Sequence, residues 1–203
     1  MMVEDGNLEI LKLLSSTSTE IAQGEVLQLQ HKGEVDMLEE TYFKITSSKT
    51  AALFSAATKV GAILGEKEAK YKEALKFYGK NIGLTFQIAD DILDYNSDLK
   101  SFGKETGNDF FEGKVTLPII LLCQKISNSE KTILKNLFYK KKREKEELNY
   151  VLNLIKKNNT IKDCYKKADH FINLASNSLS IFQDSKEKKI LKNLTTFSIE
   201  RNF

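Results

Sequence analysis

Proline and cysteine are scarce in this chain of 203 residues, and long apolar runs are missing. Pro118 is the one proline, and strand-like runs of valine and threonine do not occur, so we expect helix nearly everywhere. Cys123 and Cys164 form no CxxC pair, which argues against a disulfide framework or a zinc site and favours a reduced, cytoplasmic protein. No apolar stretch reaches the roughly 18 residues that span a bilayer.

Arginine is also rare, because only Arg143 and Arg201 among the 31 lysines and arginines are arginines. Bidentate arginine contacts to bases or phosphates are therefore nearly excluded, and with a net charge of +3 we expect no nucleic-acid partner. A phosphate site in this chain would use lysine as a point charge. We interpret the basic run at residues 140–143 as a solvated turn, with a phosphate patch as the alternative.

Apolar residues recur with helical spacing along most of the chain, which predicts a single domain made of a helical bundle. The third expected helix should be buried, because residues 82–95 are apolar on nearly every side. Residues 96–114 hold three glycines and no helical period, so they are the best candidate for a functional loop. The expected helices cover approximately residues 8–29, 38–64, 68–95, 118–126, 130–138, 144–155, 161–182 and 186–200.

Three aspartates interrupt the buried third helix, at Asp90, Asp91 and Asp94. Their spacings of three and four residues place the carboxylates on one helical face, where they repel one another unless a cation neutralises them. Magnesium typically joins one or two carboxylates to substrate phosphates, so aspartates on a rigid helix suit it. The alternative is a solvated acidic face, but the residues on either side of the aspartates are apolar, which favours a cavity.

Other polar residues near the aspartates suit the same site. Gln87 lies one turn before them and should point into the same space, unless it is a buried capping amide. Lys104 and Lys114 each follow a glycine in the 96–114 loop, where backbone freedom lets an ammonium group approach a phosphate.

The stretch from Gly83 to Leu122, GLTFQIADDILDYNSDLKSFGKETGNDFFEGKVTLPIILL, resembles the second aspartate-rich region of trans-prenyl diphosphate synthases. The resemblance includes the DDxxD motif and, at fixed intervals after it, two Gly-Lys pairs, a Gly-x-Asp and a Thr-Leu-Pro. The segments 24–30 (GEVLQLQ) and 48–54 (SKTAALF) are similar to family helices that line the same cavity. These segments are most similar to octaprenyl diphosphate synthases, which make the side chain of ubiquinone-type quinones.

This resemblance implies an all-α helical bundle of the isoprenoid synthase type that lacks its N-terminal helices, with one partial polyprenyl synthetase domain over residues 1–203. It implies a Mg²⁺ site made by Asp90, Asp91 and Asp94. It also implies that five residues contact the allylic diphosphate: Lys49, Thr50, Gln87, Lys104 and Lys114. Of these, Lys49, Gln87 and Lys104 would also assist catalysis. An ordinary surface role is the alternative for Lys49.

The implied reaction transfers an allylic prenyl group to isopentenyl diphosphate, so these two diphosphates are the expected ligands. Magnesium and lysines would stabilise the departing diphosphate, and no nucleophilic side chain would be needed.

One departure from the family pattern concerns the N-terminal side. Family members carry a first aspartate-rich motif and upstream arginines, whereas here no adjacent aspartate pair precedes Asp90 and no arginine precedes Arg143. We therefore expect the C-terminal part of such an enzyme, acting as a homodimer or with a separately supplied N-terminal half. The alternatives are a non-catalytic subunit or truncated remnant that binds a partner synthase, and a helical scaffold whose aspartates bind nothing.

Overall fold

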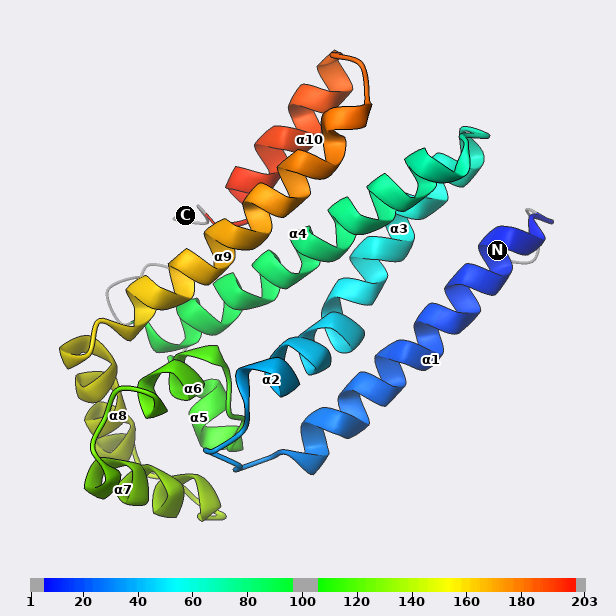
Figure 1. The fold of residues 1–203 in the computed structure, drawn as a ribbon. Coiled ribbons are helices and arrows are strands. Elements are labelled where there is room, and N and C mark those ends of the chain that lie inside the picture. Colours follow the sequence, from blue (N-terminus) through cyan, green and yellow to red (C-terminus); the bar gives the residue numbers. More distant parts are fainter. Residues whose placement is uncertain (1–5, 97–105, 200–203) are drawn as a thin grey trace.

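The computed structural model describes residues 6–96 and 106–199, and every regular element in these two ranges is helical (Figure 1). The prediction of an all-α fold is confirmed. In chain order the elements are α1 (Leu8–Gln30), α2 (Glu39–Thr46), the π-helical segment η1 (Ser47–Ala51), α3 (Ala52–Leu64), α4 (Ala69–Tyr95), α5 (Asn108–Glu112), α6 (Leu117–Cys123), α7 (Asn128–Tyr139), α8 (Lys145–Lys157), α9 (Thr160–Ser178), the 3-10 turn η3 (Leu179–Ile181) and α10 (Lys186–Phe197). None of the described helices is long and apolar enough to cross a membrane.

Helix α4 runs through the middle of the bundle, between α3 and α9 (Figure 1). Its second half is buried as the sequence predicts, with Ile88 and Ile92 at 0% and 1% exposure. The small helices α5 and α6 lie against the C-terminal end of α4 (Figure 1). Every residue of α6 is buried, and Pro118 occupies its first turn, where a missing backbone N–H costs nothing.

The expected single helix from Leu38 to Leu64 is interrupted. Helix α2 passes into the π-helical turn η1 before α3 begins, so the backbone of Ser47–Ala51 is wider than an α-helix. Helix α1 crosses η1 closely at Gly24, where an added Cβ would come within 2.6 Å of the Lys49 backbone nitrogen. Glycine at position 24 therefore lets α1 lie directly against the turn that carries Lys49 and Thr50.

Glycines also bring α4 close to α3 and to the end of η1. A Cβ on Gly79 would lie 2.4 Å from the Phe54 carbonyl oxygen, and a Cβ on Gly83 would lie 2.5 Å from the Cα of Ala51. The short distance allows side chains of α3 to reach the backbone of α4. Thr58 donates a hydrogen bond to the Leu75 carbonyl at 2.6 Å.

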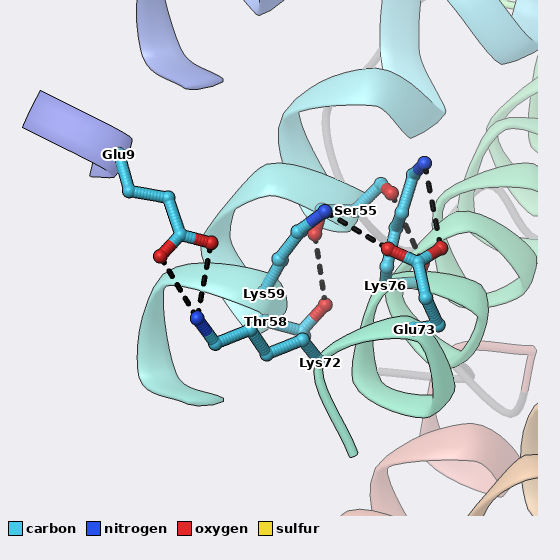
Figure 2. Close-up of polar contacts among 7 residues, drawn as sticks. All are labelled: Glu9, Ser55, Thr58, Lys59, Lys72, Glu73 and Lys76. Atoms are coloured by element: carbon cyan, nitrogen blue, oxygen red, sulfur yellow. Dashed lines mark hydrogen bonds and ion pairs between the residues drawn. The ribbon is translucent and has the colours of Figure 1, made fainter. Parts of the chain in front are cut away.

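Ion pairs join the ends of α1, α3 and α4 that lie far from α5 and α6 (Figure 2). Lys59 of α3 pairs with Glu73 of α4 at 2.9 Å, and Lys72 of α4 pairs with Glu9 of α1 at 2.8 Å. These partly exposed pairs each contribute about 0.2–1 kcal/mol to the free energy of unfolding. Their main effect is therefore on how the helices are aligned, and their effect on stability is small.

Helix α1 is the least covered of the long helices. It lies on the outer side of η1 and α3 (Figure 1), and only Thr17 and Gly24 are buried. Its apolar side chains Leu8, Val26 and Leu29 are 79%, 55% and 61% exposed. Much of the apolar surface of α1 therefore has no cover from the described part of the chain.

Candidate functional site

A cavity of about 230 Å³ opens where α1, α2, η1, α4 and α5 meet. The structure brings six of the eight residues predicted from the sequence to its wall: Lys49, Thr50, Gln87, Asp90, Asp91 and Lys114. Asp94 lies behind the wall, and Lys104 falls outside the described residues. Residues that are 65 positions apart in the sequence thus share one polar cavity.

Asp91 lies at the inner end of a chain of hydrogen bonds. It is 2% exposed, and its two carboxylate oxygens accept from the Tyr42 hydroxyl at 2.6 Å and from the Gln87 amide at 2.8 Å. Thr50 of η1 donates to the Gln87 carbonyl oxygen at 2.8 Å, so Gln87 links η1 to α4. Burial, and then the negative charge of Asp109, raises the pKa of Asp91 to about 8 despite these donors.

Asp94 does not line the cavity but holds helix α5 in place. Its carboxylate accepts from the backbone N–H groups of Asn108 at 3.1 Å and Asp109 at 2.9 Å, which belong to the first turn of α5. Gly107 precedes this turn with a φ of +91°, a conformation that favours glycine. The spacing of the three aspartates predicts one cluster, but the structure gives Asp94 a different neighbourhood because α5 supplies donors to it.

Helix α5 adds a carboxylate that the sequence analysis did not assign, Asp109. It lines the cavity with Asp90 and Asp91, and burial together with the charge of Asp94 raises its pKa to about 6, while Lys114 opposes that shift. The signal for Asp109 was the Gly-x-Asp that follows the DDxxD motif. The spacing of Asp109 from Asp90 does not indicate that the two residues share a wall of the cavity.

The two lysines of the cavity are both ion-paired. The ammonium of Lys49 lies 2.6 Å from Glu25 Oε2 and donates to Gln28 Oε1 at 2.6 Å, both on α1. The ammonium of Lys114 lies 2.6 Å from Glu112 Oε2 and 4.0 Å from Asp109 Oδ1. Lysine as a point charge is thus present at the cavity, as the scarcity of arginine predicts.

Arg143 is buried instead of facing solvent. It is 8% exposed and donates hydrogen bonds to the carbonyl oxygens of Leu137, Phe111 and Phe138. Its guanidinium packs so closely on Gly113 that a Cβ there would lie 2.5 Å from Nη2. Our interpretation of residues 140–143 as a solvated turn is therefore wrong for Arg143, which ties the residues before Lys114 to the end of α7.

The donor set fits a hard divalent cation that is only partly enclosed by protein. Carboxylates of Asp90, Asp91 and Asp109 line one cavity, and burial, followed by the charge of neighbouring carboxylates, raises the pKa values of Asp91 and Asp109. Within the described residues, however, no three acidic, histidine or cysteine side chains converge tightly enough to hold a metal by themselves. Such a cation would need oxygens from water and from a bound anion, which is the usual arrangement for magnesium.

Comparison with known proteins identifies the family. The polyprenyl synthetase family model matches residues 1–155. The chain belongs to the polyprenyl synthetase family. An all-trans-nonaprenyl-diphosphate synthase of Rhodobacter capsulatus is 35% identical over 99% of the chain, and the octaprenyl diphosphate synthase of Escherichia coli K12 is 42% identical over 59% of it.

Solved structures of the family have the same fold. A polyprenyl synthase from Caulobacter crescentus, complexed with calcium and isoprenyl diphosphate, superposes with a TM-score of 0.94 at 32% identity and covers the whole chain. A decaprenyl diphosphate synthase from Rhodobacter capsulatus gives a TM-score of 0.92 at 34% identity. The chain covers 62% of each of these structures and 61% of the nonaprenyl relative, so it spans about three fifths of their length, in their C-terminal portion.

Proposed function

We propose that the cavity binds the diphosphate group of an allylic prenyl substrate together with Mg²⁺, as part of a polyprenyl diphosphate synthase of the octaprenyl kind. One observation carries this proposal: carboxylates from α4 and α5 and two lysines from distant segments line the same cavity. The calcium and isoprenyl diphosphate in the Caulobacter structure support it, since that relative matches the whole chain.

The aspartates would share the metal site unequally. Asp90 and Asp109, at the cavity wall, would offer carboxylate oxygens to the cation, and Asp91 would add a third from deeper in the wall. Asp94 would act through α5, because its hydrogen bonds to the backbone of Asn108 and Asp109 fix where Asp109 lies. When bound, magnesium would neutralise charge that builds up on the departing diphosphate.

The remaining residues would hold the diphosphate and orient it. Lys49 and Lys114 would donate to phosphate oxygens, and Thr50 and Gln87 would fix the position of the wall between η1 and α4. Lys104 stays a predicted phosphate ligand on sequence grounds alone. Cationic donors that are already in place stabilise developing negative charge more effectively than water does, and here they would favour transfer of the allylic group to isopentenyl diphosphate.

We also propose that the chain acts with a second polypeptide, as a homodimer or with an N-terminal half, in the cytoplasm. The exposed leucines and valine of α1 support a partner, because apolar side chains on one helix face usually mark an interface. The same observation supports a second candidate function, a non-catalytic subunit or remnant that binds an intact synthase. In that case magnesium and diphosphate would leave the stability of the chain unchanged.

The test is the shift in melting temperature that magnesium plus inorganic pyrophosphate produces at matched ionic strength. Binding at a hundredfold excess over the dissociation constant stabilises a protein by about 2.7 kcal/mol, so weaker binding shows as a smaller shift. We expect a shift in the parent chain and a reduced shift in Asp90→Asn. Asp169→Asn, at an exposed position on α9, is the matched control and should behave as the parent. Equal shifts in both variants would rule out the assigned metal site.

A further inference from the structure

Two glutamates form ion pairs with the lysines of the cavity. They are Glu25 on α1 and Glu112 at the end of α5. Glu25 pairs with Lys49 and Glu112 pairs with Lys114, each at 2.6 Å. The hydrogen bond to Lys114 lowers the pKa of Glu112, with a smaller contribution from the charge of Lys49. Burial lowers the pKa of Lys114, but Glu112 outweighs it and raises that pKa, with a smaller contribution from Glu25. Each cavity lysine is therefore paired with a glutamate that does not itself line the cavity.

These glutamates neutralise the two lysines that could attract an anion. The described cavity wall also carries Asp90, Asp91 and Asp109, and burial raises the pKa of Asp91 to about 8, so that near neutral pH Asp90 and Asp109 carry most of the negative charge. A diphosphate that arrived alone would have to displace both glutamates from the lysines and then face the aspartates with its own negative charge. A divalent cation among the aspartates removes that repulsion and frees the lysines to change partners.

We propose that Glu25 and Glu112 make diphosphate binding conditional on a divalent cation, by holding Lys49 and Lys114 in ion pairs until the metal is present. This inference rests on the proposed function and adds a specificity device to it. The side chains of Glu25 and Glu112 are 48% and 57% exposed, so they can swing into solvent when the lysines turn to phosphate. They select the metal complex of a diphosphate over the free anion without touching either.

Isothermal titration of the full chain with inorganic pyrophosphate tests this, once in EDTA and once in excess magnesium, at the same ionic strength. The test variant is E25Q/E112Q, in which each glutamine keeps an oxygen for its lysine but loses the charge. The matched control is E20Q/E146Q, which changes net charge equally at exposed positions on α1 and α8 away from the cavity wall. Circular dichroism of each variant shows whether it is folded, and the single variants replace any double variant that is not.

We expect the metal-free affinity of E25Q/E112Q to rise roughly tenfold, since each exposed ion pair removed is worth roughly two- to fivefold. The affinity in magnesium should change less, so the ratio of the affinity in magnesium to the affinity in EDTA falls. E20Q/E146Q should keep the ratio of the parent chain. An unchanged ratio in E25Q/E112Q overturns the inference, as does metal-free binding that stays undetectable. A parallel fall in both affinities also overturns it, because it would show that the glutamates only position the lysines. If the parent does not bind pyrophosphate even in magnesium, the proposed function fails as well.

Discussion

At the scale of single residues, Asp91 and Asp94 show how neighbours decide what a carboxylate does. Both are almost fully buried on α4, at 2% and 4% exposure. Asp91 receives side-chain donors from Tyr42 and Gln87 and reaches the cavity, whereas Asp94 receives backbone donors and positions α5. Replacing either one should therefore damage the site, but through different elements.

The hydrogen bond between Tyr42 and Asp91 should stabilise the fold even without a ligand. Tyr42→Phe removes the donor and leaves a buried oxygen of Asp91 without it, which costs about 1–3 kcal/mol. Urea unfolding of the metal-free chain measures the loss. Tyr139→Phe is the control, because Tyr139 is 72% exposed and should change stability by less than about 0.5 kcal/mol. Equal stabilities of the two variants would contradict a structural role for the Tyr42 hydroxyl.

Contacts within one helix of the site were predictable, but contacts between helices were not. Gln87 is one turn from Asp91, so helical spacing alone places the two side chains together, as their hydrogen bond shows. Asp109 comes from a different helix, and its position depends on how α5 folds back onto α4 through Asp94. Helical spacing contains no information about such contacts between distant segments, so the sequence could not assign Asp109.

At the scale of elements, most helices were predictable because their apolar period is regular, as the match between the expected 68–95 and the observed Ala69–Tyr95 shows. The π-helical turn η1 was not predictable, because its sequence SSKTA does not differ from that of an α-helical turn. What distinguishes it is the packing of α1 against it at Gly24. Helix α5 was also missed, because five residues are too few to show a helical period. Tertiary packing decides both elements.

The close contact between η1 and α4 at Gly83 gives a prediction at this scale. Gly83→Ala would place a methyl group 2.5 Å from the Ala51 Cα, so the two elements must separate, at a cost of about 3 kcal/mol. Because η1 carries Lys49 and Thr50, the shift in melting temperature with magnesium pyrophosphate should shrink too. Thermal unfolding with and without this ligand measures both effects.

Gly61→Ala is the matched control for that change. Gly61 lies within α3 with nothing within 4 Å of an added Cβ, so alanine there should stabilise the chain by about 0.5–1 kcal/mol through its better helix propensity. Opposite signs for the two substitutions are the expected result. If Gly83→Ala is as stable as Gly61→Ala, α4 and η1 are farther apart in solution than in this structure.

At the scale of the whole molecule, the described chain leaves apolar side chains of two helices uncovered. Apolar side chains are exposed along α1 and also on α3, where Leu53 and Leu64 are 54% and 66% exposed. The chain spans about three fifths of the length of its relatives. Binding a diphosphate and elongating a prenyl chain should therefore be separable activities here.

We expect the purified chain to bind magnesium pyrophosphate but not to elongate prenyl diphosphates. The described cavity gathers one set of aspartates, and the sequence contains no second pair of adjacent aspartates before Asp90 with which to activate and orient both substrates. Incubation with an allylic diphosphate and radiolabelled isopentenyl diphosphate, followed by product chromatography, measures elongation. Adding an N-terminal half from a relative should restore labelled product to the parent chain and not to Asp90→Asn. Labelled polyprenyl diphosphate from the parent chain alone would show that one aspartate cluster suffices, and the cavity would then have to provide for both substrates.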